Sequence, residues 1–384
     1  MITPHQLDLW SSNFAELYNA LEGEIIRIMI KRLSSGHTDI LEWQTDALKD
    51  LHLFNNEVVK ELAKVTGVAE SEINKMFETA GKQTVTDIDK VMPYETKPMP
   101  SNLDNIIKSY ADQSWSGIDN LVNQTLVTTN YGVGAATLAY QGVLRRTQAL
   151  FNAGLLNFDQ SLEKAIQELA QKGIRSAFID KGGHSWSLER YVRTVLKSTL
   201  ANTYDTLRKD RMAEYGVHTV VVTSHMGARP ACSLIQGHVV DLRDNVPPDS
   251  EYKSIYDPYW KAEYGTPGGH RGVNCNHLHI PFIPGVNTNN QPSYDASENA
   301  EVSKLMKKQR ELERAIVKLK KNQMVAEAMG HTDNAAEWGR KVRAMQKRTR
   351  ELVDSNEYLS RNYKREKVYT PLNTLLKDFR YDDF

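Results

Sequence analysis

Residues 224–284 hold the densest group of side chains in the chain that can bind a metal or act as nucleophile and base. Both cysteines of the 384-residue chain lie there, and so do several histidines. The candidate ligands are Cys232, Cys275, His225, His270, His277 and His279. Thiolate and imidazole are ligands that tetrahedral Zn²⁺ prefers, so one hypothesis is a structural zinc site that uses both cysteines and one or two histidines. Such a site would join two distant loops, because metal binding replaces a core that glycine-rich polar loops cannot build.

Two other interpretations of this stretch stay open. Neither the segment around Cys232 nor the segment around Cys275 contains the Cys-x-x-Cys pair that makes zinc motifs specific. The cysteines can instead be small buried apolar side chains, with the histidines, Asn274 and Gln236 bonding loop backbone groups and Arg229-Pro230 bracing a turn. A cysteine near a histidine can also be a nucleophile and its base, and His/Asn/His groups occur in metal-dependent nucleases. The catalytic alternative is therefore a metal-dependent nuclease or a cysteine-centred transferase.

Composition and charge restrict the class of protein. The chain has 48 basic and 48 acidic residues, which argues against a generally cationic nucleic-acid binder but permits local patches that cancel over the whole chain. Two cysteines cannot form a disulfide framework, and no basic region followed by an apolar run opens the sequence. No apolar run approaches the roughly 20 residues of a membrane-spanning helix. We expect a soluble protein made in a reducing cytoplasm.

Helices are predicted on both sides of residues 224–284. Apolar residues recur at helical spacing from Phe14 to an end near Ser34-Ser35-Gly36, and again from Trp43 as far as Gly81. Three prolines within residues 92–102 predict a linker, because proline lacks a backbone donor and disfavours helix at the residue before it.

Helical spacing resumes at Ile106 and breaks near residues 131–134. One further helix is expected to end at Gly173, and a longer one to run from Leu188 to Tyr215, with Gly216 as its cap. The first 216 residues are therefore expected to be helical.

A small β-containing module follows. The β-branched run at residues 219–223 predicts a strand, and residues 238–240 predict a second strand after the Gln236-Gly237 turn. Residues 244–285 are rich in proline, glycine, tyrosine and asparagine, a composition typical of long ordered loops.

Beyond residues 287–293, helical spacing returns in a basic segment. A turn near Gly330 predicts that a second long helix folds back, which gives a helical hairpin. The basic side chains are Lys304, Lys307, Lys308, Arg310, Arg314, Lys318, Lys320 and Lys321. They form either a solvated face or a docking surface for nucleic acid or an acidic protein. No aromatic residues lie among the lysines, so the pattern does not favour a base-stacking platform.

The predicted fold class is α+β and mainly helical, with a long helical N-terminal region, a small β-containing central module and a C-terminal helical hairpin. The predicted regions are an N-terminal helical region (1–92), a proline-rich linker (93–103), a second helical region (104–216), the α+β module that carries the motifs (217–286), and a basic helical hairpin with a tail (287–384).

The ordered series of motifs resembles a known family. The residues that carry the resemblance are His225, Gly227, Arg229, Pro230, Gln236, Gly237, Asn274, Cys275, His277 and Pro281. Residues 309–316 extend it into the basic helix after the module. In these features the chain resembles the phage minor capsid protein 2 family, which is related to the F-like head morphogenesis proteins of phage Mu.

The resemblance implies a function that composition and spacing do not show. It implies a structural rather than enzymatic virion protein, present in few copies at the portal or the inner capsid and made in the bacterial host cytoplasm. Its expected partners are the portal protein, other capsid proteins and packaged double-stranded DNA, and its expected role is in head assembly or genome delivery.

Overall fold

The computed structural model describes residues 2–34, 39–129 and 132–382. Long helices make up most of them, and one small three-stranded sheet and two short hairpins make up the strands. The predicted mainly helical α+β fold class is confirmed. The division into five regions stays a prediction, and helices from residues 1–92 and 104–216 share one apolar core.

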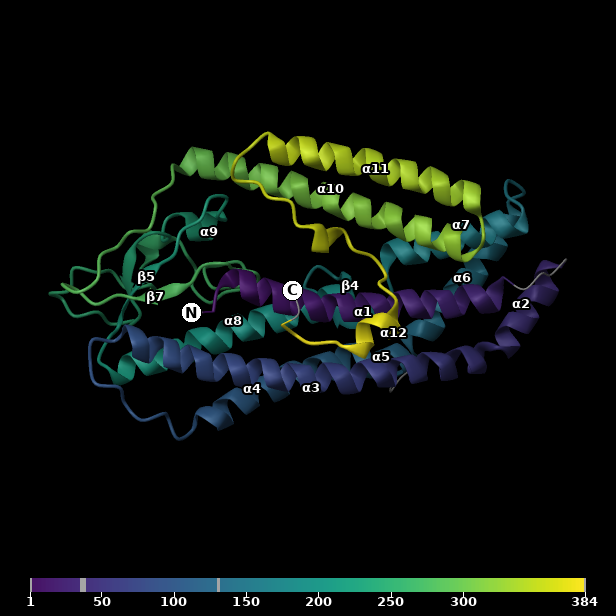
Figure 1. The fold of residues 1–384 in the computed structure, drawn as a ribbon. Helices are drawn as coiled ribbons and strands as arrows, with labels where there is room; N and C mark the ends of the chain where they lie inside the picture. The colour runs from purple at the N-terminus through teal and green to yellow at the C-terminus, as the bar shows by residue number, and fades with distance from the viewer. Residues whose placement is uncertain (1, 35–38, 130–131, 383–384) are drawn as a thin grey trace.

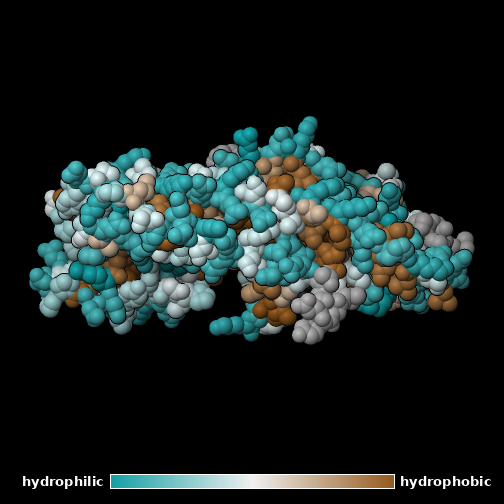
Figure 2. Space-filling model, turned by 90° about the horizontal axis from the view of Figure 1, so that it is seen from below, coloured by the Kyte–Doolittle hydropathy of each residue, from teal (hydrophilic) through white to brown (hydrophobic). Residues whose placement is uncertain are grey.

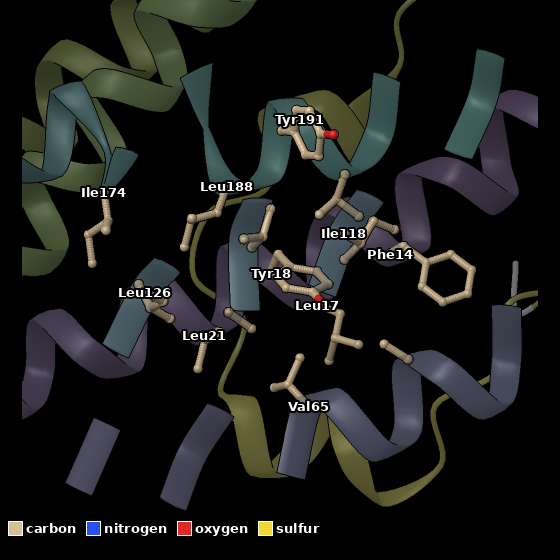
Figure 3. Close-up of a cluster of buried hydrophobic side chains, with 14 of the residues drawn as sticks. Phe14, Leu17, Tyr18, Leu21, Val65, Ile118, Leu126, Ile174, Leu188 and Tyr191 are labelled. Carbon is tan, nitrogen blue, oxygen red and sulfur yellow. The ribbon is translucent and has the colours of Figure 1, made fainter. Parts of the chain in front are cut away.

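Four helices run along the long axis of the molecule (Figure 1). They are α1 (Pro4–Leu33), α3 (Leu51–Val91), α4 (Leu103–Ile118) and α8 (Leu188–Glu214). Figure 3 shows how side chains from these helices meet, with Tyr18 of α1 among Val65, Ile118 and Leu188. Each fully buried aliphatic side chain of this kind contributes about 1.5–3 kcal/mol to folding.

The ends of these helices follow local sequence signals. Thr3 caps α1 in a reciprocal capping box with Gln6, and Ser34 follows its last residue, as predicted. Ser35 and Gly36 lie outside the described residues. Asp39 caps α2 (Ile40–Lys49). Residues 92–102, which contain the three prolines, form no helix and separate α3 from α4.

The predicted helix end at Gly81 is wrong, since α3 continues to Val91. A Cβ at Gly81 would lie 2.5 Å from Ile107 Cδ1, so the glycine permits close packing of α4 on α3.

The predicted break in the helical pattern near residues 131–134 is confirmed at Gly132, Val133 and Gly134, which belong to no helix. The chain passes through a π-helical turn (Asp119–Asn123) and α5 (Gln124–Val127), and then through the paired strands β1 (Thr128–Thr129) and β2 (Gly132–Val133). Tyr131 lies outside the described residues. Helices α6 (Ala135–Asn152) and α7 (Phe158–Lys172) follow, and Gly173 caps α7 as expected. The antiparallel pair β3 (Arg175–Ile179) and β4 (Ser185–Ser187) was not predicted.

The β module (residues 217–286) lies at one end of the molecule (Figure 1). Strand β5 (Thr219–Val222) is central and pairs antiparallel with β6 (Val239–Asp241) and β7 (His279–Pro281). The first two strands are those predicted. Val220, Val222, Val240 and Trp260 belong to a second, small apolar core, which also includes Ile88 of α3 and Met212 of α8. Two short helices complete it, α9 (Pro230–Ser233) and a 3-10 turn (Pro258–Trp260).

The predicted C-terminal hairpin is confirmed. Helices α10 (Ala296–Ala328) and α11 (Thr332–Asp354) pack against each other along one side of the molecule (Figure 1). The turn between them places Gly330 at a φ of 76°, a conformation that favours glycine.

The C-terminal segment (residues 355–382) returns across α1 (Figure 1). It contains a 3-10 turn (Tyr363–Glu366) and α12 (Leu372–Lys377). Tyr369, Leu372 and Tyr381 are buried in the main core. The Tyr369 hydroxyl donates to Glu22 Oε1 at 2.7 Å, so this segment is part of the packed structure.

Figure 2 shows the molecule from below, as a largely hydrophilic surface with hydrophobic groups toward the middle and right of the view. The large exposed apolar side chains include Leu41 and Leu48 of α2. None of the helices in the described residues combines the length and the apolar character needed to span a bilayer.

Candidate functional site

The Cys/His cluster consists of Cys232, His270, Cys275 and His277. All four side chains are buried, and each offers a ligand atom within 4.8 Å of the other three. The two Sγ atoms lie 3.9 Å apart, and Cys275 Sγ lies 3.4 Å from His277 Nδ1. The structure thus brings together four of the six residues that the sequence predicted as candidate metal ligands.

Two loops with left-handed backbone conformations carry these side chains. Cys232 lies on the single turn of α9, which starts at Pro230 shortly after Gly227 turns the chain at a φ of 80°. Cys275 follows Asn274, whose φ of 58° is in the left-handed region. Arg229 Nη2 donates to the Val273 carbonyl at 3.1 Å and joins the loops directly.

A second layer of polar groups surrounds the histidines of the cluster. His270 Nε2 lies 2.9 Å from His279 Nε2, and His279 Nδ1 lies 3.0 Å from Asp205 Oδ1 on α8. His277 Nε2 lies 3.1 Å from Gln236 Oε1. His279 is therefore placed beside the cluster and not within it.

His225 also lies beside the cluster. Its ring stacks on that of His277, with centroids 4.4 Å apart and planes 25° apart. Its backbone N–H donates to Gln236 Oε1 at 3.2 Å. Gln236 thus holds two of the predicted histidines in place with one amide oxygen.

Burial and neighbouring groups set the protonation states. Burial lowers the pKa of His279 to about 4, and it also lowers the pKa of His270. The contact with Cys232 is the largest cause that lowers the pKa of Cys275, while the contact with Cys275 raises the pKa of Cys232. A Cys275 thiolate beside a neutral His270 is the state in which these groups bind metals.

Asp205 stays ionised beneath the cluster. Burial alone would raise its pKa, but His279 and Arg271 hold that pKa well below its usual range. Asp205 belongs to α8, about 70 residues before the histidines that it faces.

The remaining motif residues brace the module. The Gly237 N–H donates to the Val222 carbonyl at 2.8 Å, and Pro281 lies opposite Val220 in the sheet. A Cβ at Gly227 would lie 2.5 Å from Met306 Sδ on α10. The Asn299 side chain exchanges two hydrogen bonds of 2.9 Å with the backbone of Ala228 and so fastens the motif loop to α10.

A second site is the basic cleft, about 660 Å³ in volume, between α1, α8, α10 and the C-terminal segment. Four acids and eleven basic residues line it. The basic residues are Lys172, Arg190, Arg193, Lys197, Arg310, Arg314, Lys318, Lys321, Lys364, Arg365 and Lys367. Asp8 on the cleft wall pairs with Arg193, Lys197 and Arg365 at 2.8–3.3 Å.

The structure divides the predicted basic face. Arg310, Arg314, Lys318 and Lys321 line the cleft, whereas Lys304, Lys307 and Lys308 are exposed elsewhere on α10. Lys320 Nζ donates to the Glu366 carbonyl at 2.7 Å, and the buried Lys321 pairs with Glu22 at 2.6 Å. Lys320 and Lys321 therefore have structural partners.

The order of these motifs on the fold is that of a known protein family. Residues 2–354 match the sequence model of phage minor capsid protein 2. The chain belongs to this family. The resemblance inferred from the motifs is confirmed, and the match extends to the helical region before residue 187.

Two curated phage proteins are similar to this member of the family. A protein named "Structural protein" from Lactococcus phage LL-H is 33% identical over 362 residues, which cover 93% of this chain and 95% of the relative. A "Structural protein" from Lactococcus phage mv4 is 36% identical over 118 residues, 31% of this chain and 93% of the relative. No solved structure matches the chain. It is a phage structural protein.

Some residues of these sites were not found from the sequence. Asp205 and Asn299 lie on long helices, where a single polar residue gives no signal of a distant partner. Helix α11 also exposes basic side chains that the sequence analysis did not single out. They are Arg340, Lys341, Arg343, Lys347, Arg348 and Arg350.

Proposed function

We propose that this minor capsid protein lies inside the phage head near the portal, contacts the portal protein and the packaged DNA, and acts in head assembly or genome delivery by binding alone. Its membership of the family and the names of its relatives support a place in the virion. The basic cleft is the observation that carries the contact with DNA.

The cleft has more positive charge than its own acids neutralise. Lys172, Arg190, Arg314 and Lys318 are exposed on its lining, and no ion pair is recorded for them within the described part of the chain. Lysine and arginine without acidic partners bind phosphates and release the counterions that surround DNA. A cleft of this volume accepts a short run of phosphates from one strand.

Helix α11 adds a second basic surface. The six basic side chains that it exposes are flanked by Glu337 and Glu351, which pair with Lys341 and Lys347. Arg340, Arg343 and Arg348 have no ion pair recorded in the described residues. A duplex that follows the α10–α11 hairpin would meet these charges in addition to those of the cleft.

Binding fits the Cys/His cluster better than catalysis does. Cys232 and His270 are 0% exposed, and Cys275 and His277 are 9% and 2% exposed. A nucleophile or a hydrolytic metal needs contact with its substrate, and a catalytic zinc keeps one open position. The buried cluster therefore supports a structural role.

DNA binding by the double variant Arg314→Ala/Lys318→Ala tests the proposal. Each lost phosphate contact lowers the slope of log Kobs against log salt by about 0.9, so we expect a reduction of roughly 1.8 with duplex DNA. The matched control, Lys60→Ala/Lys108→Ala, removes exposed lysines from α3 and α4 and should keep the slope of the unmodified chain. Binding that does not depend on salt, or equal slopes for both variants, would contradict the DNA contact.

A further inference from the structure

We propose that Cys232, Cys275, His270 and His277 bind one structural Zn²⁺ ion that fastens the two motif loops of the β module. The inference is independent of the proposed contact with DNA. It rests on the distances within the Cys/His cluster, on the hydrogen bonds of the two histidines and on the small core of the module.

Two distances within the cluster match those of a tetrahedral zinc site, and all four ligand atoms lie within 4.8 Å of one another. With Zn–S bonds of about 2.3 Å and Zn–N bonds of about 2.0–2.1 Å, a tetrahedron places two sulfurs about 3.8 Å apart and a sulfur and a nitrogen about 3.6 Å apart. The two Sγ atoms are separated by 3.9 Å, and Cys275 Sγ and His277 Nδ1 by 3.4 Å. Two thiolates and two imidazoles form one of the usual donor sets of structural zinc.

The hydrogen bonds of His277 leave its Nδ1 for a metal. Gln236 Oε1 also accepts from the His225 backbone N–H, which fixes the orientation of the amide. His277 Nε2 must therefore carry the proton and donate to that oxygen, at 3.1 Å. The unprotonated Nδ1 then faces the sulfur of Cys275, and a Zn²⁺ ion between them satisfies both lone pairs.

The contacts of His270 likewise leave its Nδ1 free to bind a metal. Its Nδ1 is buried with no hydrogen-bond partner in the described residues, whereas its Nε2 contacts His279 Nε2. His279 Nδ1 lies 3.0 Å from Asp205 Oδ1, which favours the proton of His279 on that nitrogen and leaves His279 Nε2 as the acceptor for His270 Nε2–H. His270 Nδ1 is the nitrogen left for the metal.

Both histidines therefore have the outer partners that zinc ligands require. A metal-binding histidine usually donates its other ring N–H to an oxygen acceptor, which fixes the ring and makes it a better ligand. His277 donates to the Gln236 side-chain oxygen, and His270 donates to His279, whose other ring nitrogen lies 3.0 Å from Asp205 Oδ1. The contact with Asp205 also ties the proposed centre to α8.

The module has a structural need for such an ion. Its apolar core is small and is shared with Ile88 of α3 and Met212 of α8, and residues 242–278 contain no strand and one 3-10 turn. Cys232 comes from the loop after β5, whereas the other three ligands come from the loop before β7. A closed, buried site with four protein ligands holds these loops together as an apolar core would.

Metal analysis of the full-length chain tests the proposal. The chain is produced in zinc-containing medium and purified without chelator, and we expect about one Zn²⁺ per chain. Cys275→Ser should lower the zinc content at least tenfold, and His238→Asn, which changes a histidine of the module outside the cluster, should not change it.

A second measurement covers the case in which Cys275→Ser does not fold. Replacement of zinc by Co²⁺ in the unmodified chain should give the intense visible bands of tetrahedral cobalt and the near-ultraviolet charge transfer of thiolate ligands. A chain that carries less than about a tenth of an equivalent of zinc and gives no cobalt spectrum would overturn the proposal. A Cys232–Cys275 disulfide in freshly purified protein would overturn it too, since bonded sulfurs are about 2.0 Å apart and cannot both bind the ion.

Discussion

At the scale of single residues, the six candidate ligands fall into two groups with different roles. Cys232, Cys275, His270 and His277 meet at distances suited to a metal, whereas His225 and His279 contact them from outside. The sequence predicted all six as ligands, because residue type and spacing along the chain do not show which ring nitrogens face one another. The partners Asp205 and Asn299 could not be found at all, since they reach the module only through the packing of α8 and α10.

The division of the histidines predicts different results for two alanine variants. His279→Ala removes the acceptor of His270 Nε2–H, so zinc affinity should fall about 10- to 100-fold, the usual cost of losing a group that orients a metal ligand. His225→Ala removes only a ring stacked on His277 and should leave one zinc per chain. Competition with a chromophoric chelator measures both affinities. If His225→Ala lost the metal and His279→Ala kept its full affinity, the assignment of ligands would be wrong.

At the scale of helices and strands, ion pairs connect elements that are distant in sequence. Asp8 of α1 bonds Lys197 of α8 at 2.8 Å and Arg365 of the C-terminal segment at 3.3 Å. Burial acts to raise the pKa of Asp8, but Lys197 and Arg193 lower it on balance. A carboxyl whose pKa is lower in the folded chain stabilises the fold above its unfolded value and loses this contribution as the pH falls through the folded value.

Asp8→Asn should therefore destabilise the protein most at neutral pH, by about 2 kcal/mol, because it removes the carboxylate that pairs with Arg193, Lys197 and Arg365 and leaves part of their buried charge unsatisfied. The difference from the unmodified chain should shrink as the pH falls below about 3.8, where Asp8 begins to be protonated in the unfolded chain. Urea unfolding at several pH values measures this. Asp112→Asn, an exposed change on α4, is the control, and a loss that stayed constant with pH would contradict the ion-pair account.

The elements that the sequence predicted are those with local signals. The long helices, the proline-rich linker and the hairpin around Gly330 follow from apolar spacing, proline chemistry and a glycine turn. The pair β3 and β4 was missed because strands of five and three residues are short and their sequences, Arg-Ser-Ala-Phe-Ile and Ser-Trp-Ser, do not show the alternation of apolar and polar residues over several positions that predicts a strand. Gly81 was wrongly predicted to end a helix. A glycine is needed there because α4 packs closely on α3 through Ile107, a contact that is distant in sequence. The return of the C-terminal segment rests on distant contacts such as Tyr369 to Glu22.

At the scale of the whole molecule, several helices and the C-terminal segment meet at the basic cleft. Residues of α1 and α8 line it together with residues of α10 and the C-terminal segment, and all of these elements also contribute side chains to the main core. The β module closes one end and is tied to α8 through Asp205 and to α10 through Asn299. A zero net charge over the whole chain therefore conceals a local concentration of positive charge in the cleft, which is compatible with the proposed contact with DNA.

The most direct test of this account is ultraviolet cross-linking of packaged DNA to the protein in purified, DNA-filled heads, followed by mass spectrometry of the cross-linked peptides. We predict that the chain is present in low copy number and that its cross-links fall within residues 310–321 and 340–350. DNA-filled heads that contain the chain without any cross-link, or heads that lack the chain although infected cells contain it, would contradict the central claim.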